Sequence, residues 1–352
     1  MQDFEIKQYT APLMKGSLVI LVGDIGGTNS NFGFFDIQFP AQLALSAHIK
    51  SRLVKNYTHT ITELVSYVET TYGVHIVIAC LGVAGVHRPA APRILPTHLP
   101  TAVNSLEISH MLQIPVALCN DFELVVWGSS ILTPGQYHVV REGTSVPHGT
   151  RVYIGAGTGL GHAIGVWDSH LDQYEAVPTE GGHVDFAPEN EFDWEFVKFL
   201  KKQYDTHKIS WERVLSGAGL ADLYTFLGFR YTFQKSLLTE LLAHEPFQPD
   251  FITAYEALDE QCATTYKLYQ RFYASYGRNS ILHAASYGGL YIAGGIAARN
   301  PSLYNETFLA YLTEGAVHHH LLSSAPVTLI TDYNVSLYGG AVHASQLISS
   351  DQ

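Results

Sequence analysis

Short apolar runs alternate with glycine-containing turns near the start of the chain. Residues 19–23 form an apolar run of strand length that leads into Asp24 and a turn containing Gly26 and Gly27. A second apolar run, residues 32–35, follows this turn directly. The order predicts two antiparallel strands joined by a tight glycine turn, whose consecutive backbone N–H groups could bind an anion.

The same order of strand, glycine loop and strand returns at residues 152–154, 155–161 and 163–167. Apolar strands and segments with helical spacing surround both hairpins. We expect a third strand near 47–54, helices from the capping box Thr60–Glu63 to Gly73, over 105–112 and along 255–273, and strands over 74–80, 116–119, 290–293 and 327–330. Strands and helices that alternate in this way predict an α/β fold with duplicated halves around a central cleft.

The length of 352 residues exceeds what one core usually serves, so the sequence predicts two domains. We place a small α/β domain over residues 1–130 and a large α/β domain over residues 131–339. Residues 1–16 are expected to form a loose leader, and the polar stretch 133–150 is expected to form a linker.

Charge and cysteine content narrow the class of protein. The chain has 20 Lys and Arg against 32 Asp and Glu, a net charge of −12, which argues against nucleic-acid or anionic-membrane partners. Its three cysteines, Cys80, Cys119 and Cys262, lie far apart, which indicates free thiols in a reducing compartment. With no signal-peptide pattern and no bilayer-spanning apolar segment, a soluble cytoplasmic protein is expected.

Neither glycine loop fits the common phosphate-binding motifs. A P-loop needs a lysine after its last glycine, but Thr28 follows Gly27 and His162 follows Gly161. The dinucleotide fingerprint also fails, because its sixth position is a leucine and a strand follows. Phosphate charge would then be met by backbone N–H groups and by Mg²⁺ held through water by Asp24. The alternative is a hairpin whose turn is glycine-rich without binding anything.

Two polar residues follow the predicted strand 116–119. Asp121 stands where open α/β sheets place their ligands, and a carboxylate there could take the proton from a phosphoryl-accepting hydroxyl. Asn120 would be a hydrogen-bonding neighbour. An Asn-Asp turn at the end of a strand is the equally plain structural alternative.

A second polar cluster surrounds two glycines at residues 179–185. Glu180 and His183 without a nearby third ligand make a weak metal site, and they suit the vicinal hydroxyls of a sugar better. Glu212 could join them, or it could be an acid in the first turn of a helix.

Six motifs, in order, give the chain its resemblance to a known family. From about Val19 to about Gln346 the chain resembles the bacterial-type glucokinase family of the hexokinase, actin and heat-shock ATPase superfamily. The motifs are Gly23-Asp-Ile-Gly-Gly-Thr-Asn29, Asn120-Asp-Phe122, Gly155-Ala-Gly-Thr-Gly-Leu-Gly161, Glu180-Gly-Gly-His-Val-Asp-Phe-Ala-Pro188, Glu212-Arg-Val-Leu-Ser-Gly217 and Ile292-Ala-Gly-Gly-Ile296. The resemblance implies a two-domain actin-like ATPase fold, related to ribonuclease H, and a C-terminal helix of about 340–352 packed on the first domain.

The resemblance also implies a role for each candidate residue. Asp121 would be the base for the 6-hydroxyl of glucose, while the other hydroxyls would be held by Asn120, Glu180, His183 and Glu212. ATP phosphates would bind at Gly26, Gly27, Thr28 and Asn29 and at Gly157, Thr158 and Gly159, with Gly294 and Gly295 against the adenosine and Mg²⁺ at Asp24. A homodimer is the family expectation.

One sugar-binding loop departs from the family pattern. Residues 97–101 read Thr-His-Leu-Pro-Thr, so that His98 stands where the family has asparagine and Thr101 where it has an aromatic residue. Thr97 and His98 remain candidate sugar ligands. The alternatives are therefore a kinase of another hexose or N-acetylhexosamine, an actin-like ATPase without a sugar substrate, and a non-catalytic sugar sensor, although a sensor would be expected to lack Asp24 or Asp121.

Overall fold

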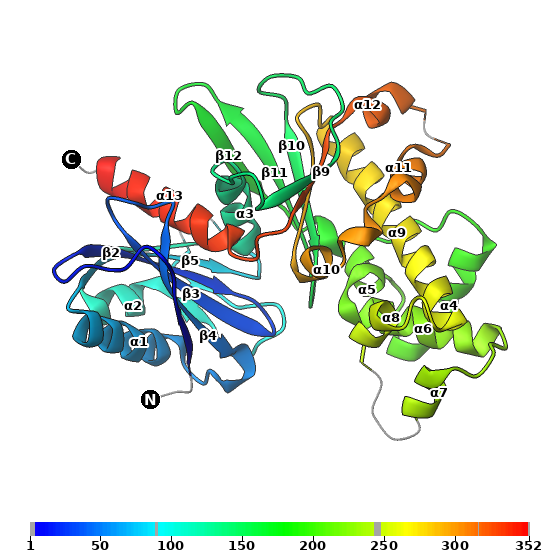
Figure 1. Ribbon diagram of the computed structural model, residues 1–352, viewed down its shortest axis with the longest axis horizontal. Coiled ribbons are helices and arrows are strands. Elements are labelled where there is room, and N and C mark those ends of the chain that lie inside the picture. The colour runs from blue at the N-terminus through cyan, green and yellow to red at the C-terminus, as the bar shows by residue number, and fades with distance from the viewer. Residues whose placement is uncertain (1–3, 89–90, 243–247, 316, 351–352) are drawn as a thin grey trace. The chain divides into compact units, whose positions relative to one another are not determined.

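Figure 1 shows the computed structural model of the chain, which describes residues 4–88, 91–242, 248–315 and 317–350. The chain forms two compact units: unit 1 holds Met1–Gln136, Ala163–Thr179 and Asp332–Gln352, and unit 2 holds Tyr137–His162 and Glu180–Thr331. The first three residues of the predicted leader and the last two of the predicted C-terminal helix lie outside the described residues. The domain limits at residues 130 and 339 stay a prediction.

The first sheet has six strands in the order β1-β4-β3-β2-β5-β8. Their bounds are β1 Glu5–Gln8, β2 Leu18–Ile25, β3 Asn29–Asp36, β4 Leu43–Lys50, β5 His75–Val83 and β8 Val116–Asn120. Strands β2 and β3 are the antiparallel hairpin predicted from the first glycine turn. Strands β2, β5 and β8 run parallel, so their carboxyl ends share one edge of the sheet.

Helices cover both faces of this sheet. Val19 and Leu21 of β2 pack into a core with α1 (Tyr57–Tyr72) and α2 (Ser105–Leu112). Ile20 and Val22, which point the other way, pack into a second core with α3 (Asp121–Ser129) and α13 (Val335–Ser350). Burial on both faces explains why β2 reads as an unbroken apolar run.

The second sheet has the order β12-β11-β10-β13-β14-β9. Its strands are β9 Tyr137–Arg141, β10 Arg151–Ala156, β11 Leu160–Asp168, β12 Gln173–Pro178, β13 Gly289–Ala293 and β14 Val327–Ile330. Strands β10, β13 and β14 are parallel, and β9 joins β14 in the antiparallel sense. The described residues also form a small pair of strands, β6 Arg93–Ile94 and β7 Val103–Asn104.

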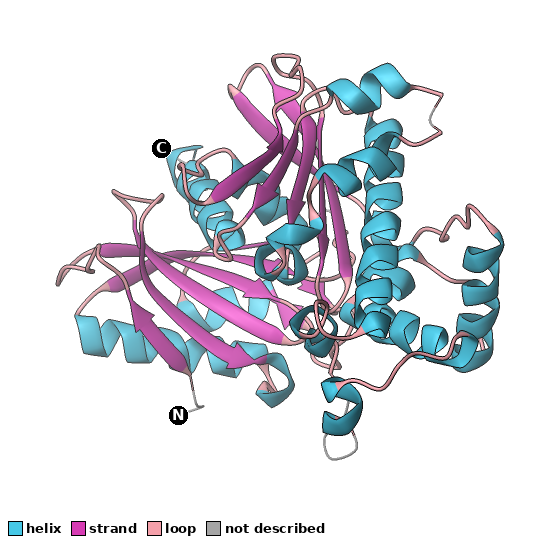
Figure 2. Ribbon diagram, turned by 45° about the vertical axis from the view of Figure 1, so that its right-hand side comes forward, coloured by secondary structure: helices cyan, strands magenta, loops and turns pink. Residues whose placement is uncertain are grey.

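The long helix α9 (Glu260–Ala284) runs beside β10 and β13 in unit 2 (Figure 2). Its buried Tyr266, Tyr269 and Tyr273 pack into the core, which confirms the helix-packing interpretation of the tyrosine stripe. The remaining helices are α4 Glu191–Tyr204, α5 Trp211–Leu215, α6 Gly217–Arg230, α7 Leu237–Leu241, α8 Asp250–Ala254, α10 Gly295–Arg299, α11 Glu306–Thr313 and α12 His319–Ser324, with 3₁₀ turns at Ser51–Leu53, Gly181–His183 and Pro301–Leu303.

Three local predictions were wrong. The predicted leader contains β1, because its backbone pairs with β4. The predicted linker contains β9, which the sheet partner β14 holds in place. Helix α1 begins after Asn56, whose side chain accepts a hydrogen bond from the His59 N–H, so Thr60 is not its N-cap.

The three cysteines are buried free thiols, as predicted. In the part of the chain that the structure describes, none of the helices is long and apolar enough to cross a membrane.

Candidate active site

The loops that follow β2, β5 and β8 are tied together at one edge of the unit 1 sheet. The Ala84 N–H donates to the Ile25 carbonyl over 3.0 Å, which joins the loop after β5 to the first glycine turn. Asn120 Nδ2 donates to the Gly85 carbonyl over 3.1 Å, which joins the end of β8 to the same loop. This edge therefore collects the predicted residues of the first hairpin and of the Asn120–Asp121 pair.

Asp24 lies near the end of β2 and accepts a 2.6 Å hydrogen bond from Ser336 Oγ. Ser336 is a buried residue in the first turn of α13, 312 positions away along the chain. Burial raises the pKa of Asp24 above its ordinary value, and the bond from Ser336 offsets part of that rise. A carboxylate desolvated in this way gains from a nearby cation, which fits the Mg²⁺ role predicted for it.

The first glycine turn is supported from the chain segment after β4. Ser51 Oγ donates to the Gly26 carbonyl over 2.7 Å, and the Ser51 N–H donates to the Thr28 carbonyl over 3.0 Å. The side chain of His98 packs on the other side, since a Cβ added to Gly27 would lie 2.9 Å from His98 Cβ. The structure thus brings the predicted sugar loop, Thr97 and His98, against the predicted phosphate turn.

Asn120 and Asp121 open helix α3. Asn120 is the N-cap: its side chain accepts from the Phe122 N–H over 2.8 Å, and its own N–H donates to Glu123 Oε2 over 2.6 Å. Asn120 is also 8% exposed, so its side chain is largely committed to the protein. Asp121 is more exposed than its neighbour, and its Oδ1 accepts from the Phe122 N–H over 3.1 Å. The cap explains how the fold holds Asp121 at the helix N-terminus.

Glu123 is a further carboxylate behind Asp121. Its burial raises its pKa, while the Asn120 N–H and the imidazole of His87, 3.8 Å away, act in the opposite direction. Because Glu123 completes the cap, its role is to fix the backbone of Asn120 and Asp121.

Unit 2 brings Glu180, His183 and Glu212 together. His183 Nε2 lies 3.7 Å from Glu180 Oε2, and His183 Nδ1 lies 3.9 Å from Glu212 Oε1. The pKa of Glu180 is raised, chiefly by burial, with His183 lowering it and Glu212 raising it further. Among the described residues, no group of three or more His, Cys, Asp or Glu side chains is placed to hold a metal ion. The cluster therefore favours hydroxyl groups over a metal.

Two glycines allow this cluster to form. A Cβ at Gly182 would lie 1.9 Å from the Leu160 carbonyl oxygen, and one at Gly181 would lie 2.6 Å from His162 Cγ. Only glycine therefore lets the turn between Glu180 and His183 lie so close to the start of β11. Burial of His162 lowers its pKa to about 4, so that its imidazole is neutral at physiological pH.

The second glycine loop is bonded to the segment that carries Glu212. The Leu160 N–H donates to Glu212 Oε2 over 3.1 Å, and the Gly217 N–H donates to the Gly157 carbonyl over 2.9 Å. Gly294, with a φ of +90°, lies beside the end of β10, because a Cβ there would be 2.8 Å from the Ala156 oxygen. The predicted phosphate loop at Gly157, Thr158 and Gly159, the predicted adenosine contacts Gly294 and Gly295, and the sugar cluster thus occupy one region of unit 2.

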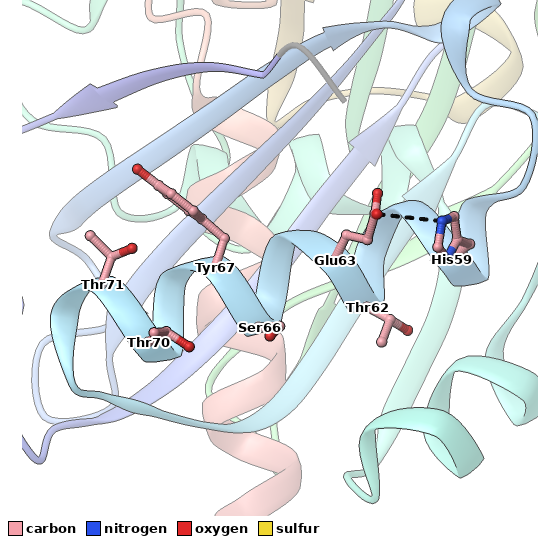
Figure 3. A pocket seen from close by; sticks show the side chains of 7 residues that line it. All are labelled: His59, Thr62, Glu63, Ser66, Tyr67, Thr70 and Thr71. Atoms are coloured by element: carbon pink, nitrogen blue, oxygen red, sulfur yellow. Dashed lines mark ion pairs between the residues drawn. The ribbon is translucent and has the colours of Figure 1, made fainter. Parts of the chain in front are cut away.

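One pocket lies elsewhere, along the outer face of α1 (Figure 3). Its seven lining residues, from His59 to Thr71, all belong to this helix, and His59 pairs with Glu63 over 3.5 Å. None of the predicted site residues lines it, so we do not assign it to the chemistry.

Comparison with known proteins agrees with the motifs. The family described as Glucokinase matches residues 21–347. The chain belongs to the glucokinase family. A glucokinase of Nostoc punctiforme is 33% identical over 284 residues, which is 76% of this chain and 82% of that protein.

Solved glucokinase structures show the same architecture. The crystal structure of a glucokinase from an Antarctic psychrotroph is 25% identical with a TM-score of 0.71, covering 93% of this chain and 99% of that one. A ROK family glucokinase from Streptomyces griseus, 16% identical, has a TM-score of 0.63 with 93% and 99% covered. The predicted actin-like ATPase fold is confirmed, and as a member of the glucokinase family the chain is an ATP-dependent sugar kinase.

Sequence reasoning missed residues that reach the site from distant segments. Ser336 contacts Asp24, Ser51 supports the first glycine turn, and Lys50 Nζ donates to Asn29 Oδ1 over 2.9 Å. No local pattern marks these residues, because each acts on a partner that the sheet or α13 brings near.

Proposed function

We propose that this protein transfers the γ-phosphoryl group of ATP to the 6-hydroxyl of glucose, with Asp121 as the general base. The observation that carries the proposal is the cluster of Glu180, His183 and Glu212, bonded through the Leu160 N–H to a glycine loop. A hydroxyl-binding cluster beside a phosphate loop suits a sugar kinase, whereas an ATPase that only switches partners would not need it.

In the proposed reaction, the 6-hydroxyl oxygen attacks the γ-phosphorus as its proton passes to Asp121, and the bond to the ADP oxygen breaks. The cap formed by Asn120 and Glu123 keeps Asp121 in place during this step. Glu180, His183 and Glu212 hold the remaining hydroxyls, together with Thr97 and His98. The Streptomyces griseus glucokinase was solved with glucose and AMPPNP, which supports both substrates.

We assign the phosphates to the two glycine loops, at Gly26, Gly27, Thr28 and Asn29 and at Gly157, Thr158 and Gly159. Gly294 and Gly295 would contact the adenosine. Asp24 would hold Mg²⁺ through water, and the ion would neutralise charge on the phosphates. A cytoplasmic homodimer belongs to the same proposal.

A panel of sugars tests the choice of substrate. ADP release should require ATP and be fastest with glucose, with mannose and N-acetylated hexosamines slower. If an N-acetylhexosamine were turned over faster than glucose, the departures at His98 and Thr101 would mark a different specificity. ATP hydrolysis that no sugar affects would favour the ATPase alternative.

Replacing Asp24 by asparagine should stabilise the fold near neutral pH. Because the folded-state pKa of Asp24 is raised above its ordinary 3.8, the folded state binds the proton more tightly than the unfolded chain. Stability therefore falls as the pH rises from the ordinary pKa through the raised one, and the whole cost remains at neutral pH. The neutral amide avoids this cost, while its oxygen can still accept from Ser336.

The same variant should respond poorly to Mg²⁺, with the concentration for half-maximal activity raised about 10–100-fold, as for other second-shell contacts. Denaturant unfolding without Mg²⁺ from acid to neutral pH and Mg²⁺ titration of activity measure the two effects. Asp205→Asn, at an exposed position, is the control. Lower stability than wild type at neutral pH together with an unchanged Mg²⁺ response would contradict the assignment.

Replacing Gly157 by alanine should weaken ATP binding without harming the fold. A Cβ at this position meets no heavy atom within 4 Å, so the protein itself does not require glycine there. A phosphate lying against the loop would require it. We expect the KM for ATP to rise about 10–100-fold, with the KM for glucose little changed. An unchanged KM for ATP would remove Gly157 from the phosphate site.

A further inference from the structure

Lys50 lies beside the first glycine turn although 21 residues separate it from Asn29. It is the last residue of β4, and the register of the sheet pairs it with Asn29. Its Nζ donates to Asn29 Oδ1 over 2.9 Å. We propose that Lys50 contacts a phosphate of the nucleotide at the Gly26–Asn29 turn, an inference that rests on the function proposed above.

The backbone that carries Lys50 is fixed relative to the turn. The next residue, Ser51, bonds to the carbonyls of Gly26 and Thr28. Ser51 is buried, and its Oγ also lies 2.9 Å from Ser30 Oγ. The stem of Lys50 therefore starts from a rigid base, while its exposed amino group can move over the turn.

The charge of Lys50 is available to an anion. Its amino group bonds to the neutral amide of Asn29, and within the described part of the chain no carboxylate lies within ion-pair distance of it. The turn itself contains neither lysine nor arginine. Lys50 thus supplies the positive charge that the turn lacks, as a lysine does in other phosphate sites by a different route through the chain.

The same bond orients Asn29. Because its Oδ1 accepts from Lys50, the amide presents Nδ2 as a donor to whatever else binds at the turn. Lys50 and Asn29 would then offer an ammonium group and an amide N–H to the same phosphate, next to the backbone N–H groups of the glycines.

Lys50→Met tests this assignment, with Lys50→Arg as the charge-conserving variant and Lys55→Met as the matched control. Lys55 is also exposed, and it is five residues further along the chain. In Lys50→Met we expect the KM for ATP and the Kd for ADP to rise about 10–100-fold, the usual worth of a charged hydrogen bond. The inhibition constant of adenosine, which has no phosphate, and the KM for glucose should not change.

Lys50→Arg should retain most of the affinity for ATP, and Lys55→Met should match wild type. A KM for ATP in Lys50→Met within about twofold of that in Lys55→Met would overturn the assignment, since a charged hydrogen bond is worth more. Equal losses of ATP and adenosine binding would do the same, because they would indicate damage to the fold. Wild-type glucose phosphorylation decides the proposed function separately, so the two failures are distinguishable.

Discussion

Asp121→Asn should lower kcat by about 10²–10⁴, the usual contribution of a general base, while glucose binding is retained. The amide is nearly the same size as the carboxylate, and its oxygen can still accept from the Phe122 N–H. The cap made by Asn120 and Glu123 does not depend on the charge of Asp121. The variant should therefore fold and bind its substrates, but the amide cannot take the proton of the 6-hydroxyl.

Steady-state kinetics and glucose binding by calorimetry measure the two effects. The matched control is Asp205→Asn, the same chemical change at an exposed helix end whose φ of +47° asparagine tolerates. The control should keep wild-type turnover. Near-normal turnover in Asp121→Asn would remove this carboxylate from the mechanism.

Gly339→Ala should destabilise the fold by at least about 3 kcal/mol, or prevent folding, because it forces two helices apart. A Cβ at Gly339 of α13 would lie 1.8 Å from the Leu124 oxygen and 2.6 Å from the Gly128 nitrogen, both in α3. These are backbone atoms, which cannot rotate out of the way. Since α3 begins with Asp121 and α13 carries Ser336, separating the helices would also disturb the unit 1 site.

Denaturant unfolding of Gly339→Ala beside Gly157→Ala isolates the steric cause. Gly157 has open space around its Cβ position, so its free energy of unfolding should change by no more than about 1 kcal/mol. If Gly339→Ala unfolded at the wild-type denaturant concentration, the close packing of α3 and α13 would be contradicted.

Sequence patterns were sufficient where burial is complete. The segments β8 and β14 were placed to within a residue, because each is a short apolar run bounded by polar residues or turns. They failed for β1 and β9, whose polar residues 5–8 and 137–141 carry little strand signal. Those strands exist because a partner strand accepts their backbone hydrogen bonds, and that partner is far along the chain.

The candidate site divides in the same way. Motifs located Asp24, Asp121, Glu180 and His183, because each stands beside a glycine or at the end of a strand. Their supporting contacts were not predictable. The bond from Ser336 to Asp24 depends on how α13 packs against β2, and the approach of Lys50 to Asn29 depends on the register of β3 and β4.

Phosphorus NMR of the reaction with glucose and ATP tests the central claim most directly, with 6-deoxyglucose as the control. The account predicts that each ATP consumed gives one ADP and one sugar phosphate carrying the new group on the 6-oxygen, and that 6-deoxyglucose is not phosphorylated. Release of inorganic phosphate at the same rate with either sugar or with none would contradict it.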